Sequence, residues 1–122
     1  MQNCQIYIDP SQIERVFMNI IINAAEAMET IGHLQLKTSY ETNDEFVEIR
    51  ISDSGPGIPE EDFRRIFDPF YTTKDVGHGT GLGLAISYGI IKEHNGNIIV
   101  ESKLGKGTTF ILNLPVKLEI RA

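Results

Sequence analysis

The sequence is poor in cysteine, in basic residues and in long hydrophobic runs. Cys4 is its only cysteine, so no disulfide can form within the chain, which is compatible with a reducing compartment. Its 11 lysines and arginines are outnumbered by 17 acidic residues, which gives a net charge of -6 at pH 7. Nucleic-acid binding needs a basic face, so we expect no nucleic-acid partner. A nucleotide site stays open, because it needs only local positive charge and backbone N–H groups.

No stretch approaches the apolar length of a membrane span, and residues 1–4 lack the charged-then-apolar order of a signal peptide. We therefore expect a cytoplasmic chain without direct membrane contact, although its parent protein could be membrane-anchored. Internal repeats, low-complexity tracts and Pro/Ser-rich linkers are also missing, so residues 1–122 are predicted to form a single domain. The abrupt entry into structure suggests that this domain is a piece of a longer protein.

Hydrophobic periodicity and turn residues predict an α+β fold. We expect helices over residues 10–28, 60–66 and 82–94, a long loop over 68–80, and strands over 4–9, 33–41, 46–53, 97–102 and 108–116. Gly96 is predicted to take the left-handed conformation after the last helix. This order predicts a two-layer α/β sandwich, with a mixed, mostly antiparallel sheet of about five strands and three helices on one of its faces.

Two glycine clusters stand out, and the first follows Asp53. By the two-residue period of a strand, Asp53 shares the core side with Ile49 and Ile51. An ionised carboxylate on that side needs a partner. Either Asp53 caps the turn of the Asp-Ser-Gly sequence, or it accepts a hydrogen bond from the exocyclic amine of adenine. Guanine carries a carbonyl at that place and would leave the carboxylate unpaired.

The second cluster places glycine at every other position over residues 77–83 and runs into the last predicted helix. Either it brings backbone N–H groups close to phosphate at the start of that helix, or it is a flexible hinge. A P-loop would need lysine after Gly81, where this chain has Leu82. A dinucleotide fingerprint would need a strand directly before the glycines, and residues 69–74 do not read as one.

Asn19 and Asn23 lie one turn apart on the first predicted helix and flank its apolar stripe. Asparagine is a middling helix former, so the pair is mildly unfavourable unless it is used. The two residues are either solvated surface positions or amide ligands, since Mg²⁺ prefers oxygen and keeps several waters.

Together these motifs resemble the ATP-binding domain of sensor histidine kinases, within the superfamily shared with gyrase, heat-shock chaperone and mismatch-repair ATPases. The resemblance spans residues 9–115 and implies a Bergerat-type fold. Its boxes follow in order: the asparagine box at 19–27, the first glycine box at 53–58, the phenylalanine box at 66–74, the second glycine box at 77–84, and the closing turn and strand at 105–110.

The resemblance implies ATP and Mg²⁺ as cofactors. Asp53 would bind the adenine amine, Asn23 would ligate Mg²⁺, and Asn19 would lie near the phosphates, which Lys74 would help to hold. Asn19, Asn23 and Lys74 are the implied catalytic residues. The implied nucleotide-binding residues are Asn19, Asn23, Ala27, Asp53, Gly55, Gly57, Ile58, Phe67, Tyr71, Thr72, Thr73, Lys74, Gly77, His78, Gly79, Thr80, Gly81, Leu82 and Thr108.

Several of these positions have a structural alternative. Phe67 and Phe70 would lie at the base of a lid and touch a partner domain, or they pack in the core. His78 would touch phosphate or belong to ordinary loop structure. Glu26 stands where several kinases carry a basic residue, and Arg64 and Arg65 would supply positive charge or form a solvated helix face.

The resemblance favours a kinase over an ATPase. Hydrolysing relatives carry a glutamate general base four residues before the Mg²⁺ asparagine, and here that position is Asn19. The implied reaction is transfer of the γ-phosphoryl group to a histidine on a separate helical dimerisation domain of the parent protein, with a response regulator downstream. None of His33, His78 and His94 fits the acceptor. The alternatives are an ATPase or serine-directed kinase of the same superfamily, and a nucleotide-binding regulatory module without catalysis.

Overall fold

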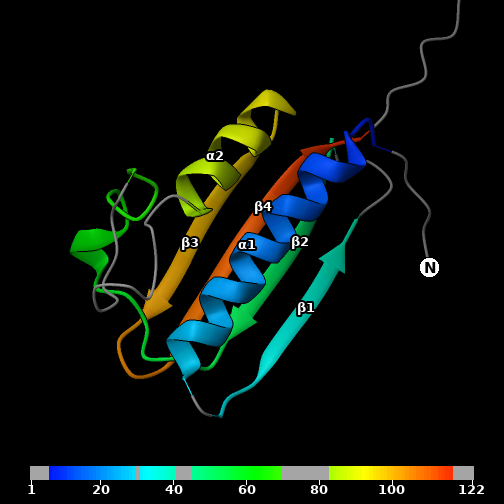
Figure 1. Cartoon of the computed structure of the whole chain (residues 1–122). Coiled ribbons are helices and arrows are strands. Elements are labelled where there is room, and N and C mark those ends of the chain that lie inside the picture. The colour runs from blue at the N-terminus through cyan, green and yellow to red at the C-terminus, as the bar shows by residue number, and fades with distance from the viewer. Residues whose placement is uncertain (1–5, 30, 41–44, 70–82, 117–122) are drawn as a thin grey trace, which may run out of the picture.

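The fold is a four-stranded antiparallel sheet covered on one face by two helices (Figure 1). The computed structural model describes residues 6–29, 31–40, 45–69 and 83–116. The strands are β1 (Leu34–Ser39), β2 (Phe46–Asp53), β3 (Asn97–Lys103) and β4 (Gly107–Pro115), in the sheet order β1-β2-β4-β3. The helices α1 (Pro10–Met28) and α2 (Gly83–Glu93) lie side by side. Within the described ranges, neither helix is long and apolar enough to cross a membrane.

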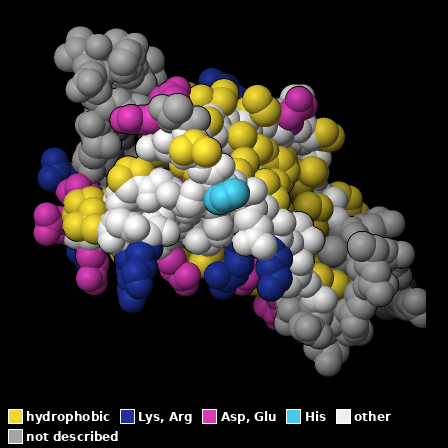
Figure 2. All heavy atoms as spheres, turned by 90° about the horizontal axis from the view of Figure 1, so that it is seen from below, with side chains coloured by type: hydrophobic (Ala, Val, Ile, Leu, Met, Phe, Trp, Pro, Cys, Tyr) yellow, Lys and Arg dark blue, Asp and Glu magenta, His cyan; other side chains and the backbone are white. Residues whose placement is uncertain are grey.

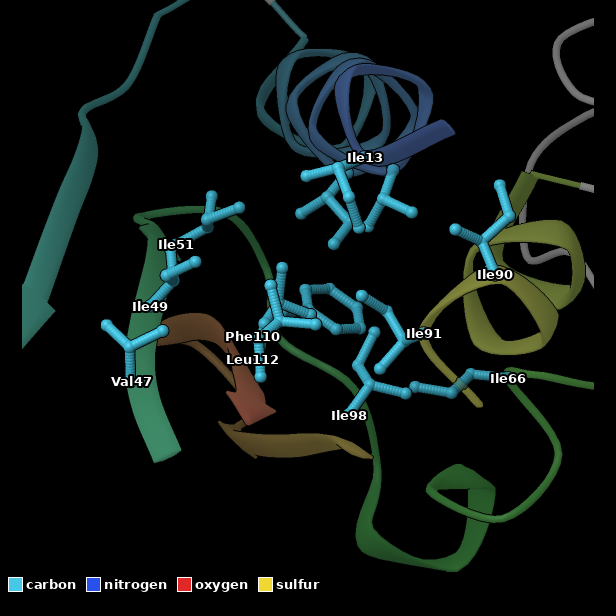
Figure 3. Close-up of a cluster of buried hydrophobic side chains, with 13 residues drawn as sticks. Ile13, Val47, Ile49, Ile51, Ile66, Ile90, Ile91, Ile98, Phe110 and Leu112 are labelled. Carbon is cyan, nitrogen blue, oxygen red and sulfur yellow. The ribbon is translucent and has the colours of Figure 1, made fainter. Parts of the chain in front are cut away.

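The core lies between the helices and the sheet (Figure 3). Apolar residues at helical spacing form the buried stripe of α1, and alternate residues of the strands face it. α2 and the described segment that ends at residue 69 close the other side, through Ile91 and Ile66. The most deeply buried members are Val16, Ile20, Ile51, Ile91, Phe110, Leu112 and Leu114. The predicted two-layer α+β sandwich is therefore confirmed.

The start of α1 matches the sequence pattern. Asp9 precedes Pro10, and its Oδ1 accepts the N–H groups of Ser11 at 3.1 Å and Gln12 at 3.4 Å. These bonds satisfy donors that have no partner inside the helix, and proline at the first position has no N–H to lose. The sequence Asp9-Pro10 therefore fixes where the helix begins.

The structure corrects the predicted number and direction of strands. Residues 4–9 were expected to form a strand, but within the described part of that range only Ile6 pairs, through an isolated antiparallel bridge to Val116. Ile6 packs against the core, but Tyr7 is 72% exposed and α1 begins at Pro10, so the described part of this stretch makes one bridge and no strand. Every strand pairing among the described residues is antiparallel, so the sheet is not mixed.

The expected third helix is also corrected. Residues 60–66 form a 3-10 turn, Glu60–Asp62, followed by further turns whose bonds mostly span three residues. In this segment only Ile66 is fully buried, so one anchor holds it and no apolar stripe favours a longer helix. The layer over the sheet, in the described part of the chain, thus has two α-helices.

β1 is an exposed edge strand. In the register with β2, Leu36 lies opposite the buried Ile51, so both face the helix side of the sheet. Leu36 is nevertheless 52% exposed, because α1 covers β2 and β4 and leaves β1 uncovered. Figure 2 shows the molecule from below. Hydrophobic side chains gather in one band of this surface, and several lysine and arginine side chains lie along the lower edge of the view.

Candidate functional site

The predicted site residues of α1 form a row along the helix. Asn19, Asn23 and Ala27 are spaced by four residues, so they stack on one side, and each is partly buried. We call this row the asparagine ridge. It flanks the fully buried stripe of α1, and its two ends meet different elements of the fold.

At its Asn19 end the ridge contacts the start of α2. Asn19 Nδ2 donates to the carbonyl oxygen of Gly83 at 3.2 Å and to Ser87 Oγ at 3.3 Å. Ser87 Oγ in turn donates to the same carbonyl oxygen at 2.9 Å. Asn19 is therefore no solvated surface residue, because its amide joins α1 to the first turn of α2.

At its Ala27 end the ridge approaches the end of β2. Asp53 is partly buried there, and its Oδ1 accepts the backbone N–H of Gly55 at 2.9 Å. Burial raises the pKa of Asp53 above its ordinary value, while hydrogen bonds from the backbone of Gly55 and Thr108 act in the opposite direction. The turn-capping interpretation of Asp53 is confirmed. It leaves room for a ligand, because an ionised carboxylate has about four acceptor positions on its two oxygens.

Gly55 shows how close the carboxylate lies to α1. A Cβ placed on Gly55 would lie 2.9 Å from Asp53 Oδ1 and 3.6 Å from the Cβ of Ala27. The carboxylate is therefore beside the last turn of α1, and Asn23 lies one turn earlier on the same row. The structure thus brings Asp53 and the asparagine ridge to one side of the molecule.

The loop after Asp53 is held by the turn between β3 and β4. Gly57 has a φ of +82°, and a Cβ there would lie 2.2 Å from the carbonyl oxygen of Lys103. The N–H of Gly105 donates to the carbonyl oxygen of Pro56 at 2.7 Å. Only glycine allows this approach of the two backbones. The first glycine box is therefore fixed in place by the closing turn, far from it in the sequence.

Two serines that the sequence reasoning did not single out support the site. The first is Ser87, whose hydroxyl bonds Asn19 and Gly83. Ser102 Oγ accepts the N–H of Ile58 at 2.8 Å, donates to the carbonyl oxygen of Gly107 at 2.7 Å, and lies 2.9 Å from the Thr108 hydroxyl. One signal for Ser87 was available: it is the one serine or threonine in α2, within a run that is mostly apolar, four residues after Gly83.

Other predicted positions have different surroundings. Phe67 packs against Tyr88 and Phe110, with ring centroids 5.4 Å and 6.3 Å away, so the core-packing alternative is confirmed for it. Arg64 and Arg65 are both exposed, and Arg65 lies 3.9 Å from Asp62. Phe70, Tyr71, Thr72, Thr73, Lys74, Gly77, His78, Gly79, Thr80, Gly81 and Leu82 lie outside the described residues.

Comparisons with known proteins agree with this geometry. A family model described as "Histidine kinase-, DNA gyrase B-, and HSP90-like ATPase" matches residues 8–118. The chain is 46% identical over 112 residues to Sporulation kinase E of Bacillus subtilis (strain 168), and 40% identical over 114 residues to the Sensor histidine kinase ZraS of Escherichia coli (strain K12). These alignments cover 92% and 93% of this chain, but 15% and 24% of those proteins. The chain thus spans a quarter or less of these two relatives.

Solved structures give the same result. The catalytic domain of histidine kinase ThkA matches with a TM-score of 0.78 and 37% identity, over 90% of this chain and 70% of that one. Full-length ShkA in complex with AMPPNP matches with a TM-score of 0.82 and 28% identity, over 98% of this chain and 24% of that one.

Proposed function

Because this chain belongs to the histidine kinase-, DNA gyrase B-, and HSP90-like ATPases, as a histidine kinase catalytic domain, we propose that it binds Mg²⁺-ATP along the asparagine ridge. The bound nucleotide then gives its γ-phosphoryl group to a histidine on a separate helical domain of the parent protein. The observation that carries the proposal is the position of Asp53 beside Ala27, at one end of a row whose other end meets the first turn of α2. Purine and phosphate would occupy these two ends.

The proposal that one end of the ridge binds purine depends on the partly buried carboxylate of Asp53. Its Oδ1 already accepts the Gly55 N–H, which fixes its orientation, and a ligand amine can use the remaining acceptor positions. Adenine carries an amine at the position that would face Asp53. Guanine carries a carbonyl there, which has no proton to donate to the carboxylate. Leaving a buried charged group unpaired costs about 1–3 kcal/mol or more. This supports ATP over GTP. Among the similar structures, ShkA is in complex with AMPPNP, an ATP analogue.

The metal proposal concerns Asn23. It lies on the ridge between the purine end and the start of α2, and its amide oxygen is a ligand type that Mg²⁺ accepts. The described residues contain no group of three His, Cys, Asp or Glu side chains that could hold a metal. A single amide fits an ion that takes its other ligands from phosphate and water. When bound, Mg²⁺ would neutralise charge on the phosphates.

Transfer is favoured over hydrolysis by the chemistry of Asn19. An amide takes no proton at neutral pH, and here its nitrogen already donates to Gly83 and Ser87. It therefore cannot serve as the general base for an attacking water. His94 does not fit the role of phosphoryl acceptor, because both of its ring nitrogens are already hydrogen-bonded. Nδ1 bonds the carbonyl oxygen of Ile90, and Nε2 accepts the N–H of Asp9. The acceptor histidine, and a response regulator after it, would be supplied by other domains on the cytoplasmic side, where ATP is available.

The test mixes the 122-residue chain with γ-labelled ATP, Mg²⁺ and the histidine-bearing helical domain of its parent. We expect label on the partner that is lost in acid and kept in base. Acid-stable label would indicate a serine acceptor, free phosphate alone would indicate an ATPase, and ATP binding without either product would indicate a regulatory module. Omission of the partner domain is the control for hydrolysis, and each of these three results would contradict the proposal.

A further inference from the structure

We propose that Ser87 is a positioning residue of this site, whose hydroxyl holds the Asn19 amide in one orientation and thereby fixes the first turn of α2 against the asparagine ridge. The inference rests on the proposed function. It adds a residue that lies outside the five sequence boxes.

The hydrogen bonds form a closed ring of three groups. Ser87 Oγ has one proton and gives it to the carbonyl oxygen of Gly83, at 2.9 Å, one turn earlier in the same helix. Asn19 Nδ2 must therefore be the donor in its 3.3 Å contact with Ser87 Oγ. Its other proton goes to the Gly83 carbonyl oxygen, at 3.2 Å. Both protons of the amide nitrogen are thus used.

This ring decides which atom of Asn19 faces α2. Exchange of Nδ2 and Oδ1 would remove two hydrogen bonds and place the amide oxygen against the carbonyl oxygen of Gly83. The ring therefore uses Nδ2 for both bonds to α2 and leaves Oδ1 as the acceptor that Asn19 can offer to a water or another donor. Without Ser87, the amide keeps one acceptor, and its rotation about the side chain is less restricted.

The burial of Ser87 indicates that its hydroxyl is needed. Its side chain is fully buried, with 0% exposed, and alanine would be the better helix former at such a position. A buried hydroxyl is unfavourable unless it is bonded, and this one is bonded on both sides. α2 also starts in close contact with the ridge, since a Cβ on Gly83 would lie 3.7 Å from Asn19 Cγ. A change at Ser87 is therefore transmitted to Asn19.

The test compares Ser87→Ala with the matched control Ser52→Ala in the 122-residue chain. Ser52 follows Ile51 in β2, so it faces the opposite side of the sheet, and its hydroxyl lies 2.8 Å from that of Thr109. Ser87→Ala removes the hydroxyl bonds to Asn19 and Gly83, Ser52→Ala removes the one to Thr109, and only Ser87→Ala acts on Asn19. Calorimetry with Mg²⁺-ATP should show a roughly three- to tenfold higher Kd for Ser87→Ala and an unchanged Kd for Ser52→Ala, since one such bond contributes about that much.

Two further readouts separate positioning from general loosening. Adenosine, which lacks the phosphates, should bind Ser87→Ala with the same affinity as the wild type. Damage to the whole fold would instead weaken the binding of both adenosine and ATP. In NMR spectra without nucleotide, the Asn19 side-chain N–H protons should be protected from exchange in the wild type and in Ser52→Ala, and less protected in Ser87→Ala, where only the bond to Gly83 remains. The near-isosteric Ser87→Cys, with its weaker hydrogen bonding, should be intermediate and serves if the alanine variant unfolds.

An unchanged ATP Kd in Ser87→Ala, or equal losses for ATP and adenosine, would overturn the role of Ser87. Failure of the wild-type chain to bind Mg²⁺-ATP would instead contradict the proposed function, so the two failures are distinguishable.

Discussion

His94, the residue after the end of α2, accepts the backbone N–H of Asp9 at 3.0 Å, so it holds the residue that caps α1. Because the His94 Nδ1 lies 2.8 Å from the carbonyl oxygen of Ile90, the ring is in the tautomer that carries its proton on Nδ1. The Asn19–Gly83 bond joins the other end of α2 to the middle of α1. The two antiparallel helices are therefore fixed to each other at both ends of α2.

Replacement of His94 by alanine should lower the free energy of unfolding by about 0.5–1.5 kcal/mol, because it removes the hydrogen bond from the Asp9 N–H to the His94 ring. Urea unfolding at neutral pH measures this loss. His33→Ala is the control, since His33 is exposed and contributes a backbone N–H, which the substitution keeps, to Ser54 Oγ at 2.8 Å. Equal stability of the two variants would show that the contact between Asp9 and His94 contributes nothing.

Asp53→Asn should weaken ATP binding by roughly 10- to 100-fold, because an amide presents a donor as well as an acceptor to the adenine amine and carries no charge. The Gly55 N–H can still bond the amide oxygen, so the loop should keep its shape. Calorimetry with ATP measures the affinity, and GTP binding reports the loss of discrimination. The assignment of Asp53 to the purine end would be refuted by an unchanged preference for ATP over GTP.

The raised pKa of Asp53 predicts how stability depends on pH. The folded chain holds a proton on this carboxyl at higher pH than the unfolded chain, whose value is near 3.8. Ionised Asp53 therefore destabilises the fold at neutral pH. This penalty shrinks as the pH falls through the raised folded-state value, and it is gone below 3.8.

Asp53→Asn should accordingly be more stable than the wild type near neutral pH, and the difference should close on acidification. Urea unfolding of both proteins over a pH series gives the difference directly, and carboxyls that the two proteins share cancel in it. A difference that stays constant with pH, or that grows on acidification, would mean that burial does not control this carboxyl.

Some of these features could be predicted from the sequence because they depend on local rules. Pro10 indicated the start of α1, and the two-residue period placed Asp53 on the helix side of its strand. The hairpins followed from alternating residues on both sides of short turns. Each of these signals needs only neighbours in the chain.

Other features depend on contacts that local patterns do not contain. The left-handed residue after α2 is Asn95, with a φ of 62°, whereas the sequence reasoning assigned this conformation to Gly96. Gly96 is required for a different reason, since a Cβ there would lie 2.2 Å from the carbonyl oxygen of Asn113 in β4. The role of Ser87 likewise depends on Asn19, 68 residues away. Such requirements appear only once the helices and the sheet are packed.

Gly57→Ala should destabilise the chain by more than Gly105→Ala, although both residues have a similar positive φ of 82° and 79°. Alanine at either position has an unfavourable backbone conformation, which costs about 1–2 kcal/mol. At Gly105 the new Cβ has nothing within 4 Å, whereas at Gly57 it meets the Lys103 carbonyl oxygen at 2.2 Å. Overpacking adds about 1–3 kcal/mol there. Thermal unfolding compares the two, and similar losses would show that the close approach is easily relieved.

Gly89→Ala should stabilise the chain by about 0.5–1 kcal/mol. Gly89 lies inside α2, its φ is not positive, and a Cβ there would have nothing within 4 Å, so alanine meets no obstacle. Glycine loses more conformational freedom than alanine when a helix forms, which is the source of the gain. Urea unfolding measures it, and the ATP affinity should stay unchanged because Gly89 is exposed and two residues beyond Ser87. A loss of stability would mean that this face of α2 is covered by a part of the chain outside the described residues.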